Sequence, residues 1–313
     1  MSRAFLFPGQ GSQAVGMGKE LAEAFATARE LFQEVDDALS QKLSKLMFEG
    51  PEADLTLTEN AQPALMAASM AVVRVAEKDF GVDLAAKGAY AAGHSLGEYS
   101  ALCAMGALTV GDAARLLKLR GQSMQKAVPV GEGAMAALLG AELDVAMQVV
   151  AEAAQGEVLG CANDNGGGQV VISGKKSAVE RAIEVSKTKG VKRGMLLPVS
   201  APFHCAMMQP AADAMAEALA TVTMNAPKLP VVSNVTAKGE SNPDDIKKLL
   251  VQQVTGLVRW REGVQWLKSQ GVAQVVELGS GKVLAGLVKR IDKEIEPLSV
   301  GTPAELEAWA KSL

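Results

Sequence analysis

Hydrophobic positions along the chain alternate between short apolar runs and longer stretches with helical spacing. The run at residues 4–7 ends in a Pro-Gly pair, which is typical of a buried strand that enters a turn. Residues 19–39 repeat apolar side chains at helical intervals, so one helix is expected there. A second run at 89–93 precedes a helical stretch at 96–105, and a third run at 275–278 again ends at glycine. This alternation predicts an α/β fold with a parallel sheet.

The middle of the chain follows a different order. Apolar runs and helical stretches alternate there as strand, helix, two strands, helix and strand, at residues 134–139, 143–154, 158–162, 169–173, 177–189 and 192–199. A βαββαβ order is the ferredoxin-like unit. We therefore expect residues 129–198 to form a small ferredoxin-like subdomain, inserted into a large α/β-hydrolase-like catalytic subdomain made of residues 1–128 and 199–313. Ligand sites tend to lie between such parts, so we expect a cleft there.

Charge and cysteine content exclude several classes of function. The formal net charge is −4, whereas a nucleic-acid binder usually carries a basic face. Three cysteines without a C-x-x-C motif indicate neither disulfides nor a zinc site, and a reducing compartment suits them. No apolar run is long enough to span a bilayer, and the first residues lack the apolar segment of a signal peptide. We expect a cytoplasmic protein that binds neither nucleic acid nor membrane.

The segment GHSLGEY at residues 93–99 carries the first candidate for chemistry. A serine between a strand and a helix, with glycine two positions away on each side, matches a nucleophile elbow. In that turn Ser95 is the nucleophile, and the Leu96 N–H is one donor to a developing oxyanion. The glycine-rich loop at residues 7–13 lacks the acidic partner of a dinucleotide site and is better suited to complete the oxyanion hole. The alternative is a structural serine that caps a helix.

A serine nucleophile needs a base, and the chain contains only two histidines. His94 adjoins Ser95, where neighbouring side chains diverge, so it is poorly placed. His204 follows a proline-bracketed loop and is the only credible imidazole for Ser95, although a lone histidine is more often structural. Asp164 is the one acid between Ser95 and His204 that is predicted to lie in a loop at a strand end, which makes it a candidate third member of a triad.

Arg120 occupies an unusual position in the helix predicted at residues 109–126. At 100° per residue it falls in the middle of the apolar stripe of that helix. A buried guanidinium is costly unless it is paired, and its planar fork matches a carboxylate. Two explanations are equally open: an internal salt bridge to an acid of the protein, or a clamp for a substrate that carries a free carboxylate.

Taken together, these motifs resemble the malonyl-CoA:acyl carrier protein transacylases of the malonyl/acyl transferase family. The resemblance covers essentially the whole chain, at residues 7–13, 93–99, 120–121 with Met124, 168–174, 203–204, 252–253 and 277–284. It implies Ser95 as nucleophile, His204 as base, Arg120 as the clamp on the malonyl carboxylate, and Gln10 with Leu96 at the oxyanion hole. It also implies that a backbone carbonyl near Gln253 orients the histidine, so Asp164 is no longer needed. Phe203 resembles the malonyl-selecting version of its loop, and Asn163 or Asn165 is expected to line the pocket.

The activity that this resemblance implies is transfer of malonate from malonyl-CoA to the phosphopantetheine thiol of acyl carrier protein in fatty-acid biosynthesis. The transfer would be ping-pong, through a malonyl-serine ester, without a cofactor or metal, in a monomer. Both carriers are anionic, and Lys187, Lys189, Lys192 and Arg193 are candidates to guide them. Two alternatives remain: a serine thioesterase or esterase, in which water replaces the acceptor thiol, and a non-catalytic interaction protein.

Overall fold

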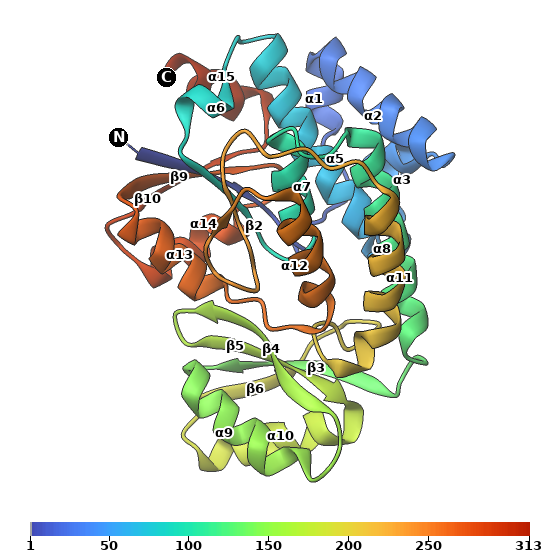
Figure 1. The fold of residues 1–313 in the computed structure, drawn as a ribbon, viewed down its shortest axis with the longest axis vertical. Coiled ribbons are helices and arrows are strands. Elements are labelled where there is room, and N and C mark those ends of the chain that lie inside the picture. Colours follow the sequence, from blue (N-terminus) through green and yellow to red (C-terminus); the bar gives the residue numbers. More distant parts are fainter. Residues whose placement is uncertain (1) are drawn as a thin grey trace.

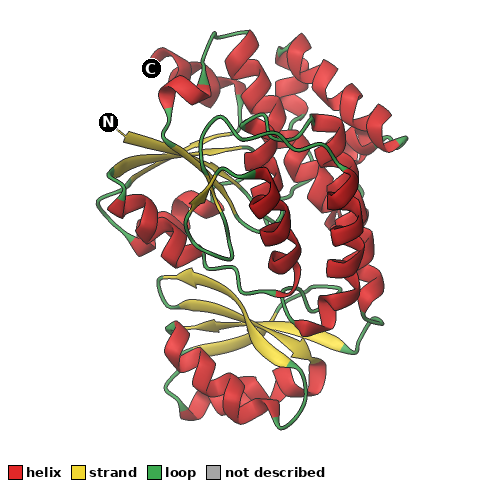
Figure 2. Cartoon of the chain, in the orientation of Figure 1, coloured by secondary structure: helices red, strands yellow, loops and turns green. Residues whose placement is uncertain are grey.

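A computed structural model describes residues 2–313 and contains two separate β-sheets (Figures 1 and 2). The larger sheet has six strands in the order β10-β9-β1-β2-β7-β8. These are β1 (Ser2–Phe7), β2 (Tyr90–Gly93), β7 (Val231–Val232), β8 (Gly239–Glu240), β9 (Val272–Leu278) and β10 (Glu296–Val300). The first five in spatial order pair in parallel, and β8 adds an antiparallel edge. The predicted α/β fold with a parallel sheet is confirmed.

Strand β1 lies at the centre of this sheet because its side chains are apolar on both faces. Phe5 and Phe7 point to one face and Ala4 and Leu6 to the other, and all four are fully buried. A strand that is buried on both faces has a continuous run of apolar residues in its sequence, rather than an alternation of apolar and polar residues. The parallel partners β2 and β9 hold β1 in register, and therefore fix where the loops after β1 and β2 emerge.

Helices cover both faces of the larger sheet. The face of Phe5 and Phe7 packs against a thick helical layer, and the opposite face packs against α13 (Trp260–Ser269) and α14 (Val283–Ile291). The thick layer contains α1 (Lys19–Ala24), α2 (Ala26–Leu39), α3 (Leu43–Glu49), α4 (Glu52–Thr56), α5 (Thr58–Lys78), α6 (Leu84–Lys87), α7 (Gly97–Ala104), α8 (Val110–Ala127), α11 (Gln209–Thr221), α12 (Pro243–Thr255) and α15 (Pro303–Lys311). None of the helices within residues 2–313 combines the length and the hydropathy that crossing a bilayer requires.

One sequence-based expectation in this layer is wrong. Residues 19–39 form two helices rather than one, because Phe25 takes an extended conformation (φ −125°, ψ 126°) that ends α1 and starts α2. Its ring packs edge-on against Phe80, with ring centroids 5.8 Å apart. The apolar stripe is nevertheless kept across the break, since Leu21, Phe32 and Val35 are buried in one core. Helical spacing therefore predicted the buried face correctly and missed the kink.

The second sheet lies below the first in Figure 1 and comes from one continuous stretch of chain. Its order is β4-β5-β3-β6, and each neighbouring pair is antiparallel. The strands are β3 (Gly133–Leu139), β4 (Leu159–Gly166), β5 (Gln169–Lys175) and β6 (Arg193–Leu196), with α9 (Leu143–Ala154) and α10 (Lys176–Thr188) in the connections. These helices and strands bury an apolar core of their own.

The boundaries of this sheet differ most from the apolar runs at two strands. Strand β4 continues past the predicted end at residue 162 to Gly166, with irregularities that re-aim the strand between Cys161 and Asn163 and again before Gly166. Strand β6 is shorter than predicted and ends at Leu196. The extension of β4 brings Asn163 beside the larger part of the molecule, where it bridges to Val258.

Candidate active site

Ser95 occupies a tight turn between β2 and α7. Its backbone lies in the left-handed region (φ 53°), which is unusual for a residue with a side chain. Glycines make this turn sterically accessible: a Cβ on Gly93 would lie 1.9 Å from the carbonyl carbon of Gly97. A Cβ on Gly97 would lie 2.2 Å from the carbonyl oxygen of Phe7. The turn thus exists because both positions lack side chains, and it presents the Ser95 hydroxyl beyond the end of the sheet.

His204 lies within hydrogen-bonding distance of Ser95. The Ser95 Oγ and His204 Nε2 atoms are 2.8 Å apart, and His204 Nδ1 lies 2.8 Å from the main-chain carbonyl of Gln253. With the Nδ1 proton donated to that carbonyl, Nε2 is the acceptor for the serine hydroxyl. Burial, and then the positive charge of Arg120, lowers the pKa of His204 to about 3. The imidazole is therefore neutral near pH 7, as a general base must be.

Arg120 in α8 is 1% exposed, its guanidinium lies over the Tyr99 ring at 5.7 Å from the centroid, and its hydrogen bonds go to amide oxygens and a hydroxyl. Nη1 donates to Gln62 Oε1 (2.7 Å), while Nη2 donates to Gln253 Oε1 (2.8 Å) and to Ser95 Oγ (3.2 Å). No carboxylate of residues 2–313 forms a salt bridge with Arg120, so the internal salt bridge considered from the sequence is wrong. Its Nε is buried without a partner among these residues. A buried cation beside the serine is thus available to an anion from outside.

The groups expected at the oxyanion hole lie at the same place. Gln10 follows β1 and Leu96 follows Ser95, and both residues line the cavity that contains Ser95. The Ser95 N–H is already engaged, because it donates to Asn234 Oδ1 at 2.8 Å. Among residues 2–313, neither the Gln10 nor the Leu96 N–H has an acceptor. Two free amide donors near a nucleophile can hold an oxyanion.

The cavity around Ser95 lies between the two sheets and has a volume of about 490 Å³. The smaller sheet contributes Asn163, Asn165 and Val171, and Phe203 contributes an aromatic wall next to His204. Within residues 2–313 the lining contains two cationic side chains, Arg120 at depth and Arg290 of α14. A cavity of this size accepts a small acyl group and part of a larger carrier.

Metal chemistry has no evident ligand set here. Within the part of the chain that the structure describes, no three His, Cys, Asp or Glu side chains come together as metal ligands. The polar groups of the cavity are instead a hydroxyl, an imidazole, amides and guanidinium groups. These groups suit acyl transfer to a hydroxyl and recognition of an anion.

His94 lies in the cavity wall but does not contact Ser95 Oγ within hydrogen-bonding distance. Its Nε2 is 2.8 Å from Asn165 Oδ1, and its ring packs at a tilt against Trp260 with centroids 5.6 Å apart. Burial lowers the pKa of His94, which favours the neutral ring that these contacts hold. This placement agrees with the sequence argument that the side chains of His94 and Ser95 diverge.

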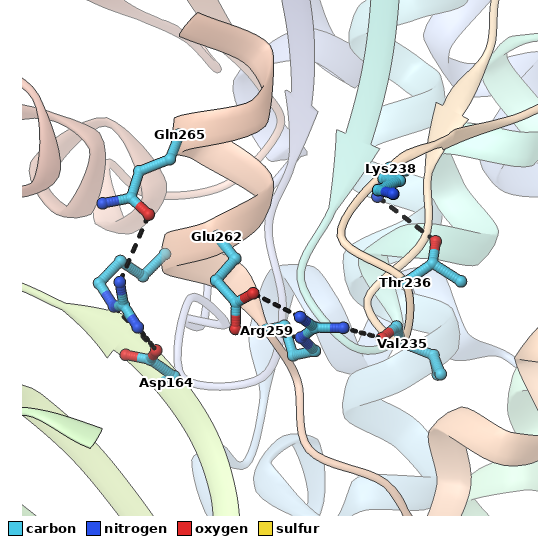
Figure 3. A network of polar contacts seen from close by, with 8 residues as sticks. Asp164, Val235, Thr236, Lys238, Arg259, Glu262 and Gln265 are labelled. Carbon is cyan, nitrogen blue, oxygen red and sulfur yellow. Dashed lines mark hydrogen bonds and ion pairs between the residues drawn. The ribbon is translucent and has the colours of Figure 1, made fainter. Parts of the chain in front are cut away.

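Asp164 pairs with a cation on the larger part of the molecule. Its Oδ2 accepts from Arg261 Nε at 2.9 Å and Arg261 Nη2 at 2.8 Å, and Arg261 Nη1 also donates to Gln265 Oε1 at 3.3 Å. Figure 3 labels Asp164 and Gln265, the two partners of this guanidinium. Asp164 is 1% exposed, so this ion pair is buried on the carboxylate side. Asp164, the candidate third member of a triad, therefore forms an ion pair between β4 and α13. His204 is oriented by the main-chain carbonyl of Gln253 instead.

The four basic residues proposed to guide anionic carriers do not line the cavity. Lys187 pairs with Glu184, and Lys189 pairs with Glu152, so both belong to ion pairs of the smaller unit. Lys192 and Arg193 also lie outside the lining. Arg290, which sequence reasoning did not single out, is the exposed cation that the structure places at this cavity.

Three further polar residues of the site were missed from sequence. Gln62 in α5 accepts from Arg120, Asn234 after β7 accepts from the Ser95 N–H, and Glu98 in α7 accepts from Gln253 Nε2 at 2.8 Å. All three are less than 5% exposed. The available signal was a polar side chain inside a continuous apolar segment, and for Gln62 that segment is the almost fully buried helix α5.

Comparisons with known proteins agree along the whole chain. Residues 4–302 match the acyl transferase domain family. The chain is 46% identical to the malonyl CoA-acyl carrier protein transacylase of Escherichia coli, over 97% of both chains, and 45% identical to that of Bacillus subtilis, over 99% of this chain and 96% of the other.

Solved structures show the same similarity in three dimensions. An acyl-carrier-protein-S-malonyltransferase from Bartonella henselae has 57% identity and a TM-score of 0.97, covering 100% of this chain and 99% of that one. A malonyl-transacylase in complex with a type II PKS acyl-carrier protein has 43% identity and a TM-score of 0.96, with 100% of each chain covered.

Proposed function

Since the chain belongs to the acyl transferase family, we infer that it transfers the malonyl group from malonyl-CoA to the phosphopantetheine thiol of acyl carrier protein in fatty-acid biosynthesis. Its relatives carry that activity in their names, and one of them is solved with an acyl-carrier protein. The observation that carries the proposal is a buried Arg120 without a carboxylate partner, 3.2 Å from the hydroxyl of Ser95.

The first half of the proposed reaction forms a malonyl-serine ester. His204 Nε2 takes the hydroxyl proton as Ser95 Oγ attacks the thioester carbonyl, and the amides of Gln10 and Leu96 hold the oxyanion. The tetrahedral intermediate collapses with cleavage of the carbon–sulfur bond. The imidazolium returns its proton to the leaving sulfur, so coenzyme A departs as a thiol and His204 is neutral again.

The second half reverses these steps with a different thiol. The phosphopantetheine thiol of acyl carrier protein gives its proton to His204 and attacks the ester carbonyl. The ester bond to Ser95 breaks, the serine regains a proton from His204, and malonyl-acyl carrier protein leaves. A thioester is consumed and a thioester is formed, so the exchange is reversible, and the proposal includes no cofactor.

Arg120 gives the proposed reaction its acyl selectivity. Of the five N–H donors of a guanidinium, three contacts are made to Gln62, Gln253 and Ser95. The remaining donors include the unpartnered Nε. A malonyl carboxylate satisfies them and neutralises the buried charge, whereas an acetyl group leaves both the donors and the charge as they were.

Architecture and location complete the proposal. We assign residues 129–198 to a small ferredoxin-like subdomain, and residues 1–128 and 199–313 to the large catalytic subdomain, an assignment supported by separate sheets and separate apolar cores. The functional unit is a monomer in the cytoplasm, and the three free cysteines fit a reducing compartment.

The experiment that tests this function measures two products from one mixture. Malonyl-CoA is incubated with the protein and pantetheinylated acyl carrier protein, and malonyl-acyl carrier protein and free malonate are quantified over time. Faster appearance of malonyl-acyl carrier protein supports the transferase. Faster release of malonate would favour the thioesterase, and absence of both products would favour a non-catalytic interaction protein.

A further inference from the structure

The loop after β1 contains one of the two proposed oxyanion donors, the Gln10 N–H. Main-chain contacts fix the start of this loop: the His94 N–H donates to the Phe7 carbonyl at 3.2 Å, and a Cβ on Gly9 would lie 2.6 Å from the His94 carbonyl oxygen. One residue later these contacts end, because within residues 2–313 neither the N–H nor the carbonyl of Gln10 forms a hydrogen bond. The position of this donor therefore depends on what holds the Gln10 side chain.

The side chain of Gln10 is held by Thr58, the first residue of α5. Thr58 Oγ1 donates to Gln10 Oε1 at 2.9 Å and accepts from Gln62 Nε2, also at 2.9 Å. Among the residues that the structure describes, Thr58 is the one hydrogen-bond partner of Gln10. Thr58 is fully buried and does not line the cavity, so its hydroxyl can affect the reaction only through its partners.

Arg120 determines the direction of these hydrogen bonds. Its guanidinium has only donors, so Nη1 binds Gln62 at Oε1 (2.7 Å), and the NH₂ end of Gln62 is left to donate to Thr58. Thr58 Oγ1 accepts from that NH₂ group and uses its own proton to donate to Gln10. Gly121 permits the arrangement: a Cβ there would lie 2.7 Å from the Thr58 carbonyl oxygen, so its absence lets α8 pack against the start of α5.

A second contact supports the far side of the same loop. The Ser12 N–H donates to the Gly9 carbonyl at 3.3 Å, and Ser280 Oγ donates to the Ser12 carbonyl at 2.8 Å. The first of these bonds lies within the loop and moves with it, and the second acts two residues after Gln10. Thr58 differs from Ser280 because it binds the residue that carries the oxyanion donor.

We propose that Thr58 is a positioning residue for acyl transfer: its hydroxyl tethers the Gln10 side chain and thereby holds the Gln10 N–H where the oxyanion forms. The proposal rests on the proposed function, which assigns the oxyanion to the amides of Gln10 and Leu96. Malonyl and acetyl thioesters form the same oxyanion, so loss of the hydroxyl should slow acylation of Ser95 by both to the same extent. Binding of the thioester should not change, since Thr58 lies outside the cavity.

The test compares Thr58→Val, which keeps the branched shape without the hydroxyl, with Thr58→Ser, which keeps the hydroxyl. The maximal rate of Ser95 acylation and the half-saturating concentration are measured for malonyl-CoA and acetyl-CoA by rapid quench and mass spectrometry. Deletion of an oxyanion donor costs roughly 10²–10³-fold in rate, and a displaced donor keeps part of its effect. We expect Thr58→Val to lower the maximal rate about tenfold for both acyl groups at an unchanged half-saturating concentration, and Thr58→Ser to stay within about threefold of wild type.

Two further variants separate the tether from general support of the loop. Gln10→Met removes Oε1 and keeps the N–H, so it should slow acylation by a similar factor, and adding Thr58→Val to it should have little further effect. Ser280→Ala removes the support at Ser12 and leaves the tether, so its effect should be much smaller. If Thr58→Val does not fold, Gln10→Met, Thr58→Ser and Ser280→Ala carry the test.

Several results would overturn the proposal. A wild-type rate for Thr58→Val, or a Thr58→Ser rate as low as that of Thr58→Val, would mean that the hydroxyl does not matter. A loss confined to malonyl-CoA would mean that Thr58 acts on Arg120 through Gln62, and an equal loss in Ser280→Ala would mean that the whole loop matters rather than Gln10. Failure of the wild-type protein to acylate Ser95 at all would instead overturn the proposed function.

Discussion

Replacement of Arg120 by methionine is the perturbation that most sharply separates malonyl from acetyl transfer. The side chain is 1% exposed and stands 3.2 Å from the Ser95 hydroxyl, so its charge acts in a site with little water. Methionine fills comparable apolar volume and offers no donor. Malonyl transfer should lose the carboxylate contacts, and acetyl transfer has no such contacts to lose.

The magnitude follows from the donors that Arg120 has free. A hydrogen bond to a charged group contributes roughly 1.5–3 kcal/mol, so a two-point contact with a carboxylate contributes about 3–6 kcal/mol. That range corresponds to a fall of roughly 10²–10⁴-fold in kcat/KM for malonyl-CoA. For acetyl-CoA we expect less than about a tenfold change, caused only by relaxation of Gln62 and Gln253.

The assay is the rate of Ser95 acylation by each thioester under pseudo-first-order conditions, with thermal unfolding of each variant measured in parallel. Unfolding matters because the variant leaves the amide oxygens of Gln62 and Gln253 without donors, at a cost of roughly 1–3 kcal/mol each. Arg115→Met is the matched control: it lies on the same helix, is exposed and pairs with Asp112. It should change neither rate.

One result would refute this reasoning. If Arg120→Met slows malonyl and acetyl transfer by the same factor while the protein remains folded, Arg120 supports the site and does not recognise the acyl carboxylate. A preserved malonyl rate would lead to the same conclusion.

Two further predictions concern the base and the turn. Because burial and Arg120 lower the pKa of His204 to about 3, the imidazole stays unprotonated well below pH 6.5. The value of kcat/KM for Ser95 malonylation should therefore show no acid limb near pH 6.5, and a limb there would mean that burial and Arg120 do not depress the pKa of His204 in the free protein. Gly93→Ala should abolish malonylation and lower the melting temperature by several degrees, since its Cβ would lie 1.9 Å from the Gly97 carbonyl carbon; a variant with wild-type activity and melting temperature in a thermal scan would mean that the turn tolerates a side chain.

Sequence alone was sufficient where a residue's type was anomalous for its position. Ser95 was found because glycines flank it between a strand and a helix, His204 because the chain has one other histidine, and Arg120 because a cation interrupts an apolar stripe. The structure brings these three residues into one hydrogen-bonded group. The role of the Gln253 carbonyl came only from the family resemblance, because a main-chain acceptor has no signature in sequence.

Other features depended on long-range contacts that a local pattern does not contain. The pairing of Asp164 with Arg261 joins residues 97 positions apart, so the sequence left Asp164 as a loop acid. Glu98, in the first turn of a helix, has the pattern of an exposed acid that favours the helix dipole, and only the fold buries it. The break at Phe25 was missed for a similar reason, since packing against Phe80 outweighs helical spacing there.

The central claim is that Ser95 carries the malonyl group between two thiols. The most direct measurement is brief incubation with malonyl-CoA, followed by mass spectrometry of the intact protein and of its peptides. We predict one malonyl adduct per chain, located on the peptide that contains Ser95, absent in Ser95→Ala and removed when pantetheinylated acyl carrier protein is added. An adduct on another residue, or no adduct in the folded protein, would contradict the mechanism.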